Sequence, residues 1–305
     1  VVFMGNPEFA IPTLKAIRHS NHDLIAVVSN PRKPIGRGRT LQLTSVGKFA
    51  KENGINLLEP ESLTCNNFRL QLEQLRPDIF VIVAYKILPK SIIELPVYGA
   101  INLHASLLPK YRGAGPVQWA LINGEKKTGV TIFQITKKVD AGDILMQKIM
   151  NVYEDDNMLS LGMRLCEQGS KMIIKTIDKI EIGTIKKIQQ DSTLATPAPK
   201  ITKKMTLIDW NWENMKIHNW VRGLSPYPGM STIYKKKRLR IYKTCIVKGD
   251  SAIPGSIVSC DNELIISTGK GLISLLEIQI EGKRKMQVNE FLRGFIVELG
   301  DVLGV

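Results

Sequence analysis

An asparagine and a histidine two residues apart carry the clearest chemical signal in the sequence. Asn102 and His104 stand at the end of an apolar run that begins at Tyr98 and is followed by a loop rich in proline and glycine. Side chains two apart on a β-strand point to the same face of the sheet, and ligands of open α/β sheets bind at the carboxyl ends of strands. We therefore expect an amide that can polarise a carbonyl beside an imidazole that can move a proton.

A third partner for these side chains is offered by Asp140 in the segment 139–144, Val-Asp-Ala-Gly-Asp-Ile. We expect this segment to be the turn after the next strand, at the same end of the sheet as His104. The Asp140 carboxylate would orient the imidazole and stabilise its protonated form. The Asn102 amide would donate to the oxyanion of a tetrahedral intermediate. These residues predict acyl transfer without a protein nucleophile, whereas a purely structural histidine is the alternative.

The first half of the chain must position these residues, and its patterns alternate between strand and helix. The apolar run at 78–84 is typical of a strand that is covered on both faces. We predict strands over 1–4, 24–28, 78–84, 99–104 and 129–135, separated by helices over 8–18, 63–75, 115–123 and, after the last strand, 159–182. This alternation predicts an α/β fold with a doubly wound, mostly parallel, Rossmann-like sheet.

The pattern changes near residue 186. Residues 186–204 are polar and include Thr-Pro-Ala-Pro, a composition that favours an extended connector. Short strand patterns spaced about ten residues apart follow, which is typical of a small, OB-like β-barrel. We predict a catalytic domain over 1–185, a linker over 186–204 and a smaller C-terminal β-barrel domain over 205–305.

The charge of the chain favours an anionic partner. Its 305 residues carry a formal net charge of +14, of which residues 186–305 supply +8. Such an excess predicts nucleic acid or an acidic membrane surface as partner, with a merely basic protein as the alternative. No apolar run approaches the roughly 20 residues that span a bilayer. The four cysteines form no CxxC pair and have no zinc spacing, and no GxGxxG motif is present, so we expect no metal and no dinucleotide site.

Two basic segments are candidates for contact with nucleic acid. Residues 30–40 combine four positive charges with two glycines and two prolines, so they form either a solvated loop or an arm that orders on RNA, with Arg37 and Arg39 as the main contacts. The second segment lies in the predicted barrel and is either a solvated hairpin or a guide for a phosphate backbone. Its residues, with a connector extension, are Lys235, Lys236, Lys237, Arg238, Lys203 and Lys204.

Several motifs together resemble a known family. The pattern Asn-x-His-x-Ser-Leu-Leu-Pro at 102–109 and the Asp-x-Gly-x-Ile turn at 140–144 resemble the 10-formyltetrahydrofolate-dependent formyltransferases. Within that superfamily, other segments are similar to the methionyl-tRNA formyltransferase family, end to end and in order. They are Met-Gly-Asn-Pro-Glu-Phe-Ala at 4–10, the segments 107–116, 195–201, 208–210 and 222–229, and the tail at 281–294.

The resemblance implies formyl transfer from 10-formyltetrahydrofolate to the α-amino group of methionyl initiator tRNA, a step of translation initiation. It implies that Asn102 polarises the formyl carbonyl, His104 moves protons and Asp140 supports the histidine. The loop with Arg37 and Arg39 would enter the acceptor end of the tRNA. Folate would lie between segments 83–89 and 135–142, with contacts from Tyr85, Leu88, Ser106, Leu107, Leu108, Pro109 and Gly142. We expect a monomer that acts in the bacterial cytosol, away from membranes, with an organelle as the alternative location.

The sequence departs from the family pattern at two points. Residues 84–89 read Ala-Tyr-Lys-Ile-Leu-Pro, one residue shorter than the family's Ala-Tyr-Gly-x-Ile-Leu-Pro and without its glycine. Asn6 stands where threonine is usual. We expect the first departure to change the shape of the folate pocket and to leave the reaction unchanged.

Other functions within and outside the superfamily are alternatives. They are formylation of phosphoribosyl-glycinamide or of sugar nucleotides, hydrolysis of formyltetrahydrofolate, and tRNA binding without catalysis. The end-to-end match through a basic C-terminal barrel disfavours the first three. The presence of Asn102, His104 and Asp140 together argues against the last.

Overall fold

The computed structural model describes residues 1–35 and 40–304, which form two compact units. The first unit holds residues 1–116, 127–151 and 162–198, and the second holds 117–126, 152–161 and 199–305. No helix among these described residues is both long enough and apolar enough to cross a bilayer.

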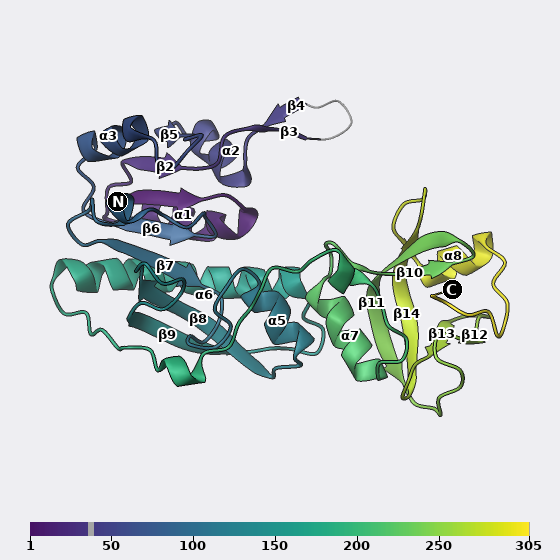
Figure 1. Ribbon diagram of the computed structural model, residues 1–305. Coiled ribbons are helices and arrows are strands. Elements are labelled where there is room, and N and C mark those ends of the chain that lie inside the picture. Colours follow the sequence, from purple (N-terminus) through teal and green to yellow (C-terminus); the bar gives the residue numbers. More distant parts are fainter. Residues whose placement is uncertain (36–39, 305) are drawn as a thin grey trace. The chain divides into compact units, whose positions relative to one another are not determined.

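Seven strands form the sheet of the first unit, and its core confirms a mostly parallel α/β sheet (Figure 1). In sheet order they are β5 (Leu57–Leu58), β2 (Ala26–Val28), β1 (Val2–Gly5), β6 (Phe80–Val83), β7 (Ala100–His104), β8 (Lys127–Gln134) and β9 (Ile144–Asn151). The first five pair in parallel. By contrast, β8 runs antiparallel to both β7 and β9.

Helices cover both faces of this sheet, as its doubly wound topology requires. They are α1 (Ile11–Arg18), α2 (Ser45–Glu52), α3 (Asn66–Gln74), α4 (Lys90–Ile93) and α6 (Met158–Glu181), with a short 3₁₀ turn, η1, at Glu8–Ala10. Helix α5 (Pro116–Ile122) belongs, apart from its first residue, to the second unit. The proline of α1 lies in its first turn, where its missing N–H costs nothing. The hydroxyl of Thr44 caps α2 by accepting from the Gly47 amide at 2.9 Å.

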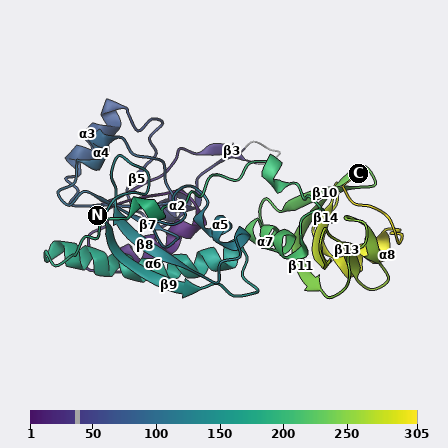
Figure 2. The same cartoon turned by 60° about the horizontal axis from the view of Figure 1, so that its bottom comes forward.

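The longest helix, α6, fixes which face of β7 remains for chemistry. Its buried side chains recur at helical spacing, at Leu161, Leu165, Met172, Ile173 and Ile177. It runs along the sheet in both views (Figures 1 and 2). A Cβ built on Gly169 of α6 would lie 2.5 Å from the Leu103 side chain, so the absence of a side chain there lets α6 press against that face of β7. The even-numbered residues of β7 therefore point away from α6.

The segment 30–40 differs from the loop that its composition suggests. Its flanks pair as a two-stranded antiparallel ribbon, β3 (Lys33–Ile35) and β4 (Thr40–Gln42). The strand β4 is exposed along its whole length, so the ladder of backbone hydrogen bonds holds this ribbon rather than a core. Arg37 and Arg39 lie outside the described residues.

The second unit is built on an antiparallel sheet of six strands that curls into a half-barrel, as the strand spacing predicts (Figure 2). The strands are β10 (Met230–Tyr234), β11 (Lys237–Val247), β12 (Ile257–Ser259), β13 (Leu264–Ser267), β14 (Leu272–Ile280) and β15 (Met286–Gln287). Helices α7 (Asn214–Gly223) and α8 (Val288–Gly294) belong to the same unit, and the 3₁₀ turns η2 (Ser192–Leu194) and η3 (Lys204–Thr206) lie in the polar connector. The core of the half-barrel is apolar, with Ile217, Ile241, Ile278 and Phe291 fully buried.

Candidate active site

Strand β7 presents Asn102 and His104 on one face, as the two-residue spacing predicts. Leu103 between them points the other way and contacts Gly169 of α6. His104 is the last residue of the strand and is 7% exposed, whereas Asn102 is half-buried. The pair therefore lies at the carboxyl end of a parallel strand, where open α/β sheets bind ligands.

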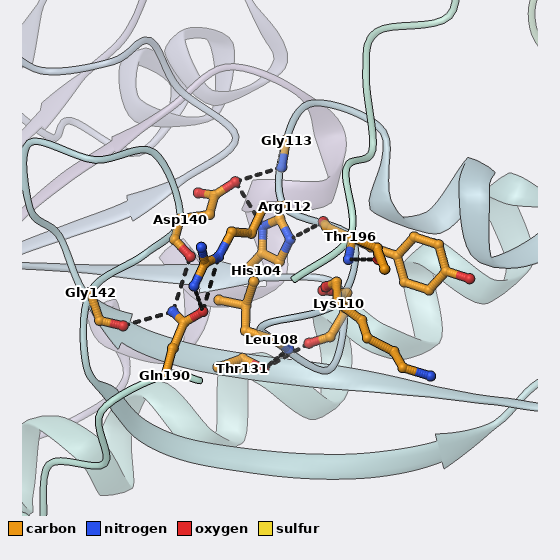
Figure 3. Close-up of polar contacts among 12 residues, drawn as sticks. His104, Leu108, Lys110, Arg112, Gly113, Thr131, Asp140, Gly142, Gln190 and Thr196 are labelled. Atoms are coloured by element: carbon orange, nitrogen blue, oxygen red, sulfur yellow. Dashed lines mark hydrogen bonds and ion pairs between the residues drawn. The ribbon is translucent and has the colours of Figure 1, made fainter. Parts of the chain in front are cut away.

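The hydrogen bond of His104 defines its tautomer. Its Nε2 lies 2.9 Å from the carbonyl oxygen of Tyr111. Because a carbonyl only accepts, Nε2 carries the proton and donates it. In the neutral ring Nδ1 is then the basic nitrogen, and it faces the Asp140 carboxylate at 3.9 Å (Figure 3). That distance exceeds hydrogen-bond reach, so Nδ1 keeps its lone pair for another donor.

The surroundings of His104 favour its neutral form. Burial of the ring lowers the pKa of His104 below its ordinary value of 6.5, while the Asp140 charge and the bond to the Tyr111 carbonyl act in the opposite direction. The Phe133 ring also packs against the imidazole, nearly perpendicular to it, with ring centroids 6.3 Å apart. At neutral pH the imidazole is therefore a proton acceptor beside a carboxylate.

Asp140 reaches His104 by a different route from the one that a parallel sheet predicts. Because β8 is antiparallel to β7, its last residue, Gln134, pairs with Ile101 near the amino end of β7. The loop after β8 then folds back over the sheet, and Asp140 adopts a left-handed φ of 50° within it. Its Oδ2 accepts from the Gly113 amide at 2.8 Å. Asp140 does lie beside His104. The expectation that β8 ends at the same edge of the sheet as His104 was wrong, because β8 runs antiparallel to β7.

A buried glutamine that the sequence did not single out holds this loop. The Nε2 of Gln190 donates to the carbonyl oxygens of Asp140 at 3.0 Å and Gly142 at 2.7 Å. Its Oε1 accepts from Nε and Nη2 of Arg112, at 3.1 and 2.7 Å. Figure 3 shows these contacts beside His104. One glutamine in a polar segment has no sequence pattern that would have revealed it.

The loop that follows β7 is braced by the connector. The Thr196 hydroxyl accepts from the Tyr111 amide at 2.9 Å. The backbone carbonyl of Thr196 accepts from the Arg112 amide at 2.8 Å. Ala198 continues the pairing by donating to the Arg112 carbonyl at 2.7 Å and accepting from the Gly115 amide at 3.1 Å. The residue whose carbonyl binds His104 is therefore fixed by this connector segment.

Several predicted folate contacts are engaged within this loop. Ser106 is buried and its hydroxyl donates to the Lys110 carbonyl at 2.7 Å. Leu107 packs over Gly129 of β8, and the Leu108 amide donates to the Thr131 hydroxyl at 3.2 Å. The peptide bond between Leu108 and Pro109 is cis. The carbonyls of Ser106 and Leu108 are engaged as well, since they accept from the Thr131 hydroxyl at 2.7 Å and from Nε2 of Gln147 at 2.9 Å. These hydrogen bonds fix the shape of the loop.

Two predicted residues after β6 border the same region. Leu88 is buried in the cluster against which Tyr85 and Ile135 pack, and Ile135 also packs against the cluster that holds Leu108. The Tyr85 hydroxyl is buried and has no hydrogen-bond partner among the described residues, and burial raises the pKa of Tyr85 to about 12. A buried hydroxyl without a partner is costly unless a bound molecule satisfies it.

The predicted basic contacts divide into two groups. Lys235 forms an ion pair with Asp301 at 3.1 Å and donates to the Ile296 carbonyl at 3.2 Å. By contrast, the side chains of Lys236, Lys237 and Arg238 are exposed in and after the tight turn between β10 and β11, as are Lys203 and Lys204 at η3. Within the part of the chain that the structure describes, no group of three or more His, Cys, Asp or Glu could hold a metal ion.

Comparison with known proteins yields matches along the chain. The formyl transferase family matches residues 1–177, and the C-terminal domain of formyl transferases matches residues 200–296. Methionyl-tRNA formyltransferase of Caldanaerobacter subterraneus subsp. tengcongensis is 42% identical over 99% of each chain. The enzyme of the same name from Thermodesulfovibrio yellowstonii is 45% identical over 96% of this chain and 95% of its own.

Solved structures share the fold. The sugar 3N-formyl transferase WlaRD, solved with dTDP and 5-N-formyl-THF, superposes with a TM-score of 0.68 at 21% identity, over 93% of this chain and 98% of its own. Methionyl-tRNA formyltransferase from Clostridium thermocellum superposes with a TM-score of 0.56 at 17% identity, over 92% of this chain and 97% of its own.

Proposed function

Because the chain belongs to the methionyl-tRNA formyltransferase family, we propose that it transfers a formyl group from 10-formyltetrahydrofolate to the α-amino group of methionyl initiator tRNA. The product serves translation initiation. The observation that carries the proposal is that Asn102 and His104 share one face of β7, with the basic nitrogen of the histidine facing the Asp140 carboxylate.

The proposed reaction is a displacement at the formyl carbon. The methionine amine attacks that carbon, and the carbonyl oxygen becomes an oxyanion to which the Asn102 amide donates. Nδ1 of His104 carries no proton in the neutral ring, so it can take the proton from the attacking amine. The C–N10 bond then breaks and the proton is returned to N10 of tetrahydrofolate. The Asp140 charge, 3.9 Å from Nδ1, stabilises the imidazolium between these two transfers.

The residues after β6 and β7 fit a folate. The buried Tyr85 hydroxyl lacks a partner among the described residues, and Leu88 lies in an apolar cluster beside it, which suits a flat ring system with polar edges. We assign folate contacts to Tyr85, Leu88, Ser106, Leu107, Leu108, Pro109 and Gly142. The bound molecule supplies the activated formyl group.

The acceptor is a polyanion, and the exposed basic residues suit it. We assign phosphate contacts to Lys236, Lys237 and Arg238, with Lys203 and Lys204 beside η3. Lys235 supports the turn through Asp301. The contact expected from Arg37 and Arg39 stays a prediction from the sequence. We further propose that residues 1–185 are the catalytic domain, 186–204 the linker and 205–305 the tRNA-binding domain of a monomer in the bacterial cytosol.

Formyl transfer to charged initiator tRNA, compared between the wild type and His104→Ala, tests this function. We expect folate-dependent transfer by the wild type. We expect its loss in the variant, with tRNA binding retained, because the imidazole moves protons and does not hold the tRNA. A wild-type chain that binds tRNA and transfers no formyl group would reject the enzyme in favour of a binding protein.

A further inference from the structure

Gln190 is buried within a polar, exposed stretch of the chain. Residues 186–189 before it are all exposed, whereas Gln190 is 7% exposed. Its side-chain amide makes four hydrogen bonds, two as donor and two as acceptor. A primary amide has two N–H groups and two lone pairs on oxygen. The site therefore uses the whole hydrogen-bonding capacity of a glutamine.

The partners of Gln190 close a ring around Asp140. Arg112 donates to Gln190, and Gln190 donates to the carbonyl of Asp140. The Asp140 carboxylate accepts from the amide of Gly113, the residue after Arg112. Figure 3 shows this ring on the Nδ1 side of His104. Both the backbone and the side chain of Asp140 are thus fixed to one segment.

The loop needs such an external support. Asp140 has a left-handed φ of 50°, a conformation that is unfavourable for a non-glycine residue. Gly142 lies so close to the Gln134 carbonyl that a Cβ there would come within 1.7 Å of its oxygen. The carbonyls of these two residues are the ones that Gln190 binds. The bonds offset the conformational cost and select one arrangement of the loop.

We propose that Gln190, itself oriented by Arg112, is a positioning residue that sets the place of the Asp140 carboxylate relative to His104. This inference rests on the proposed function, because it assigns Asp140 a part in the proton transfer. Glutamate is the same size and has no N–H to offer the two loop carbonyls, and asparagine is one methylene shorter. The position therefore requires glutamine for its donors and its reach.

The direct test replaces Gln190 by methionine, which keeps the length and removes all four hydrogen bonds. We expect kcat to fall about 10- to 100-fold, because a misplacement of about 1 Å costs that much, with KM for the tRNA held within about twofold. The matched control is Gln189→Met, at the exposed glutamine next to it, which should leave kcat unchanged. The double variant Arg112→Met with Gln190→Met should have the same kcat as Gln190→Met alone, because both substitutions break the same hydrogen-bonded ring around Asp140.

A second readout separates positioning from a loss of stability. The charged group that faces His104 among the described residues is Asp140, and its charge raises the pKa of His104. The Tyr111 carbonyl and the Phe133 ring face it from the other elements. Displacement of Asp140 in Gln190→Met should therefore lower the pKa of His104, measured by NMR of histidine-labelled protein.

A Gln190→Met variant with wild-type kcat, or one whose activity loss follows its folded fraction while the His104 titration stays in place, would overturn the proposal. If the Gln190→Met variant does not fold, Gln190→Glu replaces it. Its kcat should fall by the same factor, whereas the control Gln189→Glu should keep wild-type kcat. If the wild type transfers no formyl group, the proposed function fails separately, and the His104 titration still decides whether Gln190 positions Asp140.

Discussion

At the scale of single residues, the site depends on which nitrogen of His104 holds the proton. The bond from Nε2 to the Tyr111 carbonyl leaves Nδ1 basic, and burial keeps the ring neutral. The two-residue spacing of Asn102 and His104 was readable from the sequence because the side-chain period of a strand is two. Gln190 was not readable, because its partners are two backbone carbonyls and an arginine far away in the chain.

Replacement of Asn102 by alanine tests the oxyanion role. We expect kcat to fall about 10²- to 10³-fold, because one donor to a developing oxyanion is removed. Steady-state formylation assays measure this effect. Asn289→Ala on α8, an exposed asparagine, is the control and should keep wild-type kcat. A fall confined to KM would show that Asn102 binds the substrates and does not stabilise the transition state.

The pH dependence of the reaction tests the role of Asp140. The Asp140 charge raises the pKa of His104 against the larger effect of burial. Asp140→Asn keeps the acceptor for the Gly113 amide and removes the charge, so the pKa of His104 should fall further. Because the reaction needs the neutral imidazole, the acid limb of the kcat/KM profile should move to lower pH while its plateau drops. An acid limb that stays in place, or moves to higher pH, contradicts the assignment.

At the scale of elements, the loop between β8 and β9 brings Asp140 to the site from the opposite edge of the sheet. Five of the seven strands in the sheet of the first unit followed from apolar patterns, and the two-residue strand β5 was not predicted. Such patterns carry no information about strand direction. Strand β9 was missed, because exposed and buried residues do not alternate along it. The antiparallel return of β8 depends on pairing with β7, which is a tertiary contact.

Gly142→Ala tests whether this loop sets the activity. The added Cβ would lie 1.7 Å from the Gln134 carbonyl oxygen, so the loop must shift and carry Asp140 with it. We expect kcat to fall about 100-fold. Gly294→Ala, where a Cβ meets nothing within 4 Å, is the matched control for both kcat and melting temperature. Wild-type kcat in Gly142→Ala would show that the loop geometry does not limit the reaction.

At the scale of the whole molecule, the positive charge matches a polyanionic substrate. The net charge of +14 indicated the class of partner, because charge acts over the entire surface. The net charge does not identify which lysines touch phosphate, because some lysines form ion pairs within the protein, as Lys235 does with Asp301. The half-barrel itself was predictable from short, evenly spaced strands.

The salt dependence of tRNA binding tests the basic turn of the half-barrel. The double variant Lys236→Ala with Lys237→Ala should weaken binding and reduce the slope of log K against log salt by about 1.4 to 1.8, because two fewer phosphates are neutralised. KM for folate should not change. The control is Lys171→Ala with Lys175→Ala, two exposed lysines of α6. Equal slopes in the two double variants would remove this turn from the tRNA contacts.

The most direct measurement follows the formyl carbon itself. Wild-type protein is incubated with methionyl initiator tRNA and with 10-formyltetrahydrofolate that carries an isotopic label in the formyl group, and the methionine released from the tRNA is analysed by mass spectrometry. The proposed reaction predicts labelled N-formylmethionine, formed by the wild type and lost in His104→Ala. Unlabelled methionine from the wild type, or labelled formate released into solution in its place, would contradict it.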